Sequence, residues 1–100
     1  MRLSEIASVV RSKNAGPRLL TLDIIFPTRD LFERACLKAK ALEDYVASAY
    51  KTPSTSIRLF TFEPALAIKV TIPRKIQAGS MGDSDVYGAQ QHAPLLDFVL

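Results

Sequence analysis

Residues 18–26, RLLTLDIIF, constrain the fold more than any other part of this 100-residue chain. The run is rich in residues that favour β-strands, and apolar side chains occupy most positions on both of its faces. A strand of this kind is normally covered on both sides, so we expect a central strand of a sheet. Pro27 ends the strand, because proline cannot donate a backbone hydrogen bond to a neighbouring strand.

The remaining periodic segments predict two helices and three more strands. Residues 4–13 and 30–50 repeat apolar side chains at every third or fourth position, which indicates helices. Residues 56–63 and 65–72 predict a β-hairpin, and residues 95–100 predict a last edge strand. The order of these segments predicts an α+β fold, a two-layer sandwich of two helices on a mainly antiparallel sheet of about four strands.

The composition predicts a single globular domain over residues 1–100. Hydrophobic residues make up 48% and charged residues 23%, and one cysteine, Cys36, excludes an internal disulfide. Cys36 lies beside the apolar stripe of a helix and is expected to be a small buried hydrophobe. The net charge of +3 is mildly basic, but the basic residues are scattered, so we expect no nucleic-acid partner. We find no secretory leader and no membrane-spanning stretch, so we expect a cytoplasmic protein with no membrane partner.

The first candidate site is the segment RSKNAGP, residues 11–17. Ser12, Lys13 and Asn14 could present a hydroxyl, an ammonium and an amide to an anionic group. The alternative interpretation is a helix C-cap, with Lys13 near the carbonyl end and Asn14 or Gly16 after it. The two interpretations are compatible.

Asp23 is the second candidate, because it lies in the middle of the apolar strand. A buried carboxylate is costly unless it is paired or hydrogen-bonded. Asp23 could therefore be a general acid or base with a raised pKa. The alternative is a structural aspartate that accepts from the backbone of residues 11–17 or from a nearby arginine.

The third candidate is the long aperiodic segment 74–94, which lies between two expected strands. Loops of this length in small domains are commonly functional or disordered, and the composition fits an ordered structural loop as well as a loop that binds a ligand or partner. His92, the only histidine, is the candidate general base, and the glutamines suit the orientation of a carbonyl or carboxylate. The candidate ligand-binding residues of this loop are Asp83, Asp85, Tyr87, Gln90 and Gln91. The two aspartates and the histidine are too weak a pattern to predict a metal, so neither a metal nor a cofactor is expected.

Three blocks of the chain resemble a small bacterial family of unknown function: RSKNAGPRLLTLDIIF, EPALAIKVTIPR and GDSDVYGAQQHAPLL. Members of that family are commonly encoded beside, or fused to, proteins similar to acyclic terpene utilisation protein A. The resemblance implies a link to the catabolism of acyl-CoA or branched hydroxy-acid compounds. It carries over no established catalytic residues.

These observations support an accessory small subunit or domain of such a catabolic enzyme, with the larger protein as its partner. In this hypothesis residues 79–94 contribute to the partner's active site, together with Lys13 and Asn14. One alternative is a stand-alone lyase or hydratase that uses His92 or Asp23, with its pocket built between the chains of a homo-oligomer. The second alternative is an assembly module without catalysis.

Overall fold

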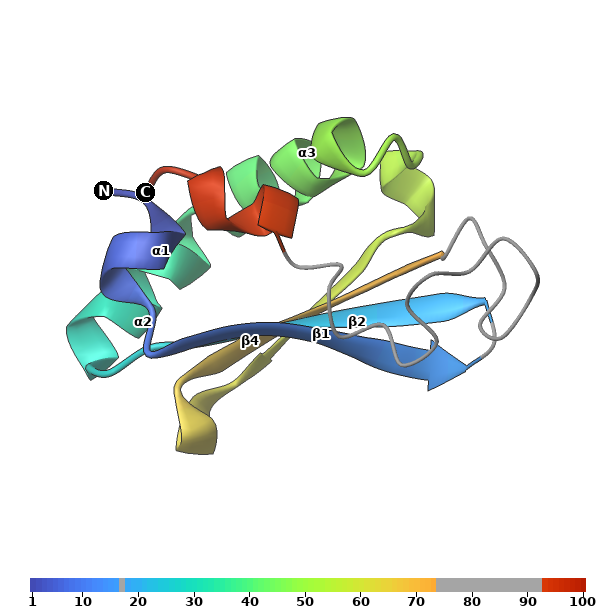
Figure 1. The fold of residues 1–100 in the computed structure, drawn as a ribbon. Coiled ribbons are helices and arrows are strands. Elements are labelled where there is room, and N and C mark those ends of the chain that lie inside the picture. The colour runs from blue at the N-terminus through green and yellow to red at the C-terminus, as the bar shows by residue number, and fades with distance from the viewer. Residues whose placement is uncertain (17, 74–92) are drawn as a thin grey trace.

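The chain folds into a four-stranded antiparallel sheet with its helices gathered on one side (Figure 1). The computed structural model describes residues 1–16, 18–73 and 93–100. The predicted α+β fold, an antiparallel sheet of four strands with two main helices, is confirmed. The elements along the chain are α1 (Leu3–Ile6), β1 (Val9–Gly16), β2 (Leu19–Ile25), α2 (Arg29–Leu37), α3 (Ala39–Ala49), the 3-10 helix η1 (Ser54–Ser56), β3 (Arg58–Phe62), the 3-10 helix η2 (Glu63–Ala65), β4 (Ala67–Pro73) and the 3-10 helix η3 (Ala93–Asp97).

The strands lie in the order β1-β2-β4-β3, and every neighbouring pair is antiparallel. β1 and β2 form one hairpin, β3 and β4 form the other, and β2 pairs with β4 between them. The strand expected over residues 18–26 is therefore central, as predicted. In this register Asp23 lies opposite Arg11 on one side and Lys69 on the other.

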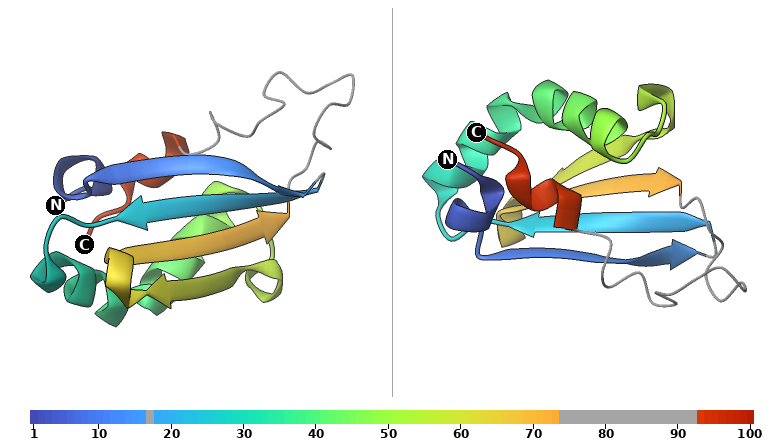
Figure 2. Two further views of the ribbon diagram at one scale, coloured as in Figure 1. Left: turned by 90° about the horizontal axis from the view of Figure 1, so that it is seen from below. Right: turned by 45° about the horizontal axis from the view of Figure 1, so that its top comes forward.

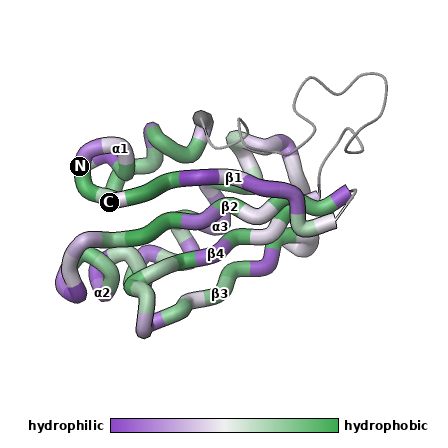
Figure 3. Tube along the Cα trace, turned by 60° about the horizontal axis from the view of Figure 1, so that its bottom comes forward, coloured by the Kyte–Doolittle hydropathy of each residue, from purple (hydrophilic) through white to green (hydrophobic). Residues whose placement is uncertain are grey.

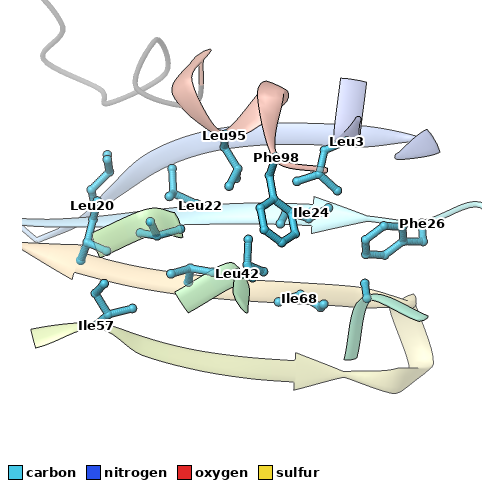
Figure 4. Packing of buried hydrophobic residues seen from close by; sticks show 14 of the residues in the cluster. Leu3, Leu20, Leu22, Ile24, Phe26, Leu42, Ile57, Ile68, Leu95 and Phe98 are labelled. Carbon is cyan, nitrogen blue, oxygen red and sulfur yellow. The ribbon is translucent and has the colours of Figure 1, made fainter. Parts of the chain in front are cut away.

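The core lies between the sheet and the helical layer (Figure 4). β2 and β4 direct alternate residues into it, and α1, α3 and the C-terminal segment cover them. The fully buried side chains of this core include Leu3, Leu20, Leu22, Ile24, Leu42, Val46, Ile68, Val70 and Leu95. Burial of these side chains is the main source of stability for a domain of this size.

The helix expected over residues 4–13 is wrong. α1 ends at Ile6, and the following residues form β1, which pairs along its length with β2. The spacing of Ile6 and Val10 fits a helix, but the adjacent pair Val9-Val10 favours a strand. Pairing with the central strand decides between them, because it satisfies the backbone groups of β1 and places its alternate residues against the core.

The helix expected over residues 30–50 is present but is divided at Lys38 into α2 and α3. The backbone of Lys38 leaves the helical region, with φ −103° and ψ 20°. Thr28 begins α2, and its hydroxyl accepts a hydrogen bond from the amide of Leu31.

The edge strand expected over residues 95–100 is also wrong. This segment contains most of η3, and only Val99 pairs in a β-bridge, with Arg2. The amide of Leu3 donates to the carbonyl of Phe98, so the two ends of the chain lie side by side (Figure 1). The amphipathic LLDF sequence buries Leu95 and Phe98 against the helical layer, and this burial outweighs strand pairing.

Candidate functional site

One face of the sheet carries no helix among the described residues, and seen from below it lies in front of the helical layer (Figure 2). We name this surface the helix-free face. It is formed by the residues that alternate with the core positions of the four strands. They include Val9, Arg11, Lys13, Thr21, Asp23, Ile25, Arg58, Phe60, Phe62, Ala67, Lys69 and Thr71.

The register arranges these side chains in three rows that cross the sheet. Side chains directly opposite each other in an antiparallel pair lie about 5 Å apart. The first row is Val9, Ile25, Ala67 and Phe62; the second is Arg11, Asp23, Lys69 and Phe60; the third is Lys13, Thr21, Thr71 and Arg58. The basic side chains thus lie in the second and third rows, between the apolar first row and a short further row of Leu19 and Pro73, where Leu19 is 43% exposed. β1 changes from hydrophobic to hydrophilic along its length (Figure 3).

The edge strand β3 exposes two aromatic side chains in the first and second rows of the helix-free face. Phe60 is 55% exposed and Phe62 is 50% exposed. Single exposed apolar residues are normal on protein surfaces, but two neighbouring phenylalanines on one edge strand form a patch, and the row of Phe62 continues across the sheet through Ala67 and Ile25 to Val9. Aromatic patches of this kind are enriched in protein interfaces.

Asp23 lies in the second row and is 1% exposed, although it points away from the helical layer. The Nε of Arg11 donates a 3.1 Å hydrogen bond to its Oδ2. Its Oδ1 is buried and has no hydrogen-bond partner among the described residues. A buried carboxylate oxygen without a donor is destabilising, so this atom is an unsatisfied hydrogen-bond acceptor on the face. The interpretation of Asp23 as the partner of a nearby arginine agrees with this geometry.

The structure separates the three residues expected to bind an anion at residues 11–17. Ser12 and Asn14 point to the helical side of β1, and Ser12 is buried there. Lys13 points to the helix-free face, where Arg58 lies in the same row and Arg11 on the same strand. The alternative, a helix C-cap, is wrong because the segment is a strand.

The loop candidates Asp83, Asp85, Tyr87, Gln90, Gln91 and His92 lie outside the described residues. The described segment after the loop, η3, is held to α3. The hydroxyl of Tyr45 donates a 2.7 Å hydrogen bond to the carbonyl of Pro94, and its ring contacts that of Phe98 at 5.2 Å between centroids. These contacts place the C-terminal end of the loop on the helical layer.

Other chemistry in the described part of the chain is sparse. No three His, Cys, Asp or Glu side chains gather there as a metal site would require. Burial, with smaller effects from Glu33 and Glu63, raises the pKa of the Cys36 thiol, which weakens it as a nucleophile at neutral pH. The helices of the described ranges are too short or too polar to cross a bilayer.

The sequence reasoning missed the helix-free face. The sequence pattern that indicates this face is the alternation in RLFTF. Arg58, Phe60 and Phe62 share one side of this strand, and Leu59 and Thr61 share the other. That pattern shows two aromatic residues and a base on one surface. The rows themselves depend on which strands are neighbours, and this is not visible in the sequence.

The chain belongs to the family described as Domain of unknown function (DUF4387), whose model matches residues 3–99. This match confirms the expectation of a small domain family of unknown function. No curated protein and no solved structure matches the chain significantly.

Proposed function

We propose that this DUF4387 member is an accessory small subunit or domain of a cytoplasmic catabolic enzyme. The enzyme acts on acyl-CoA or branched hydroxy-acid compounds, and the larger partner resembles acyclic terpene utilisation protein A. The observation that supports an accessory role is the exposed pair Phe60 and Phe62 on the helix-free face. The link to the larger protein comes from the resemblance of the three sequence blocks.

The shape of the helix-free face favours a macromolecular partner. A small substrate is normally bound in a concave pocket that buries most of its surface. A sheet face is broad and nearly flat, which suits the surface of another protein. The aromatic patch provides apolar area for the centre of such an interface, and the charged rows provide a polar rim.

In the same proposal, residues 79–94 contribute to the active site of the partner. His92 would orient or protonate a substrate oxygen there, and Gln90 and Gln91 would bind a carbonyl or carboxylate. The exposed pair Phe60 and Phe62 lies on β3, outside this loop.

Co-expression with the larger protein tests the proposal. We expect one complex of defined stoichiometry by size-exclusion chromatography with light scattering, and turnover of a branched hydroxyacyl-CoA that the domain alone does not catalyse. Separate elution of the two proteins would contradict the accessory role. Turnover by the purified domain alone would favour the stand-alone lyase or hydratase.

A second measurement separates the accessory role from a pure assembly role. The variants His92→Ala and Gln91→Ala are expected to keep the complex and to lower its turnover. Full turnover in both variants would favour an assembly module in which the loop has no catalytic part.

A further inference from the structure

We propose that the helix-free face docks on an acidic patch of the larger partner protein, and that the partner supplies an N–H or O–H donor to Asp23. This inference rests on the proposed accessory role. It adds the surface that is used and the chemistry of the partner surface that fits it.

The charge of the face favours an acidic partner. Four basic side chains lie on it, from β1, β3 and β4: Arg11, Lys13, Arg58 and Lys69. Its only acid, Asp23, is buried and already paired with Arg11. The exposed charge on the face is therefore entirely positive, and complementary charge gives such a surface its specificity and its fast association.

The apolar row places the centre of the interface at the opposite end of the face from Lys13 and Arg58. Phe62 lies in a row with Ile25 and Val9, and Phe60 lies next to it on the same strand. Aromatic side chains surrounded by polar groups are the usual residues that contribute most to binding. The partner surface should thus combine an apolar centre with carboxylates on one side.

The unpartnered oxygen of Asp23 adds a specific requirement. Oδ1 has no donor among the described residues and is covered, so a donor reaches it only when a neighbouring side chain moves. Arg11 is such a neighbour, and its side chain is 56% exposed. A lysine, arginine, hydroxyl or amide donor from the partner would then satisfy Oδ1.

The same observations disfavour other occupants. A second copy docked through the same face would bring four basic side chains against four others, which is repulsive. A single-stranded nucleic acid needs basic groups alongside each stacked base, and only Phe60 has a basic residue in its row, Lys69, whereas the row of Phe62 has none.

Binding of full-length variants to the larger protein, measured by isothermal titration calorimetry or biolayer interferometry, tests the inference. The first variant is Phe60→Ser/Phe62→Ser, and we expect at least 30-fold weaker binding. The second is Lys13→Glu/Arg58→Glu, and we expect at least 10-fold weaker binding, with a smaller salt dependence than that of the wild type. Asp23→Asn is expected to weaken binding about 10-fold while the variant still unfolds cooperatively.

Matched controls lie on the helical layer. Leu37→Ser changes an apolar side chain that is 88% exposed on α2, and Arg34→Glu reverses an exposed charge on the same helix. Both are expected to bind the larger protein within 2-fold of the wild type. If they weaken binding as much as the variants of the helix-free face, the face is not the docking surface.

The outcomes separate the two proposals. If the wild type does not bind the larger protein, the accessory role fails and this inference fails with it. If the wild type binds and the variants of the helix-free face bind equally well, only the docking surface is wrong. Binding of a single-stranded RNA oligomer or of phosphatidylserine vesicles that is lost in Lys13→Glu/Arg58→Glu would overturn the assignment of an acidic protein as the occupant.

Discussion

The two faces of the sheet are made from the same strands, yet only one of them is closed. On the helical side, β2 and β4 present Leu22, Ile24, Ile68 and Val70, which are fully buried. On the other side the same two strands carry no α-helix among the described residues, and the edge strand β3 exposes Phe60 and Phe62. The difference indicates that folding is completed by the first face, while the second retains apolar surface and an unmet hydrogen-bond acceptor. A surface with these properties is suited to a partner.

The largest effect on stability is expected on the face of the sheet that the helices cover. Leu22→Ala should lower the free energy of unfolding by about 3 kcal/mol, because it removes a buried side chain and leaves a cavity. Urea unfolding followed by circular dichroism measures this change. The exposed Leu37→Ala should change it by less than about 0.5 kcal/mol. Equal effects of the two substitutions would contradict the assigned core.

The Arg11–Asp23 pair lies on the helix-free face, and its loss should have the next largest effect. Arg11→Ala leaves the buried carboxylate without its donor and should destabilise the fold by about 2 kcal/mol. The double variant Arg11→Ala/Asp23→Ala should be more stable than the sum of the two single variants predicts, since no buried charge remains. Additive single effects in urea unfolding would show that the pair is not coupled.

Tyr45 tests how firmly the C-terminal segment is held on the helical layer. Tyr45→Phe removes the hydrogen bond to the carbonyl of Pro94 and keeps the ring contact with Phe98, so a loss of about 1 kcal/mol is expected. Hydrogen exchange of the amides of residues 95–98 should accelerate in this variant. Unchanged exchange would mean that this hydrogen bond does not stabilise η3.

The smallest effect on stability is expected on the helix-free face. Phe60→Thr and Phe62→Thr should each change the free energy of unfolding by less than about 0.5 kcal/mol, because the rings are half exposed and threonine favours strands. Thermal unfolding of the two variants measures this. A loss above about 1.5 kcal/mol in either would assign the phenylalanines to the fold and remove the main support for a docking surface.

Part of the candidate site was visible in the sequence. Asp23 stands out in the sequence because a carboxylate in an apolar strand needs a partner, and the partner in the structure is an arginine, Arg11. The sequence also indicates Lys13 as a cation for an anionic group, together with Ser12 and Asn14, in a segment expected to leave the end of a helix. The segment is a strand, and a strand places successive side chains on opposite faces, so Lys13 is separated from the other two.

What the sequence determined by itself is the set of elements with a strong local pattern. These are the central strand at residues 18–26, the hairpin of β3 and β4, and the helical region that follows Pro27. Each is encoded by apolar periodicity and by proline, which act within a few residues of the chain.

Only the tertiary structure decided which strands are neighbours and which face the helices cover. Those choices convert residues 9–16 into a strand, place η3 on α3, and bring Arg11, Asp23, Lys69 and Phe60 into one row. The physical reason is that pairing and burial join residues far apart in the chain, and their free energy exceeds the local preference of a short segment. The helix-free face and the Oδ1 of Asp23, which has no donor among the described residues, result from that arrangement.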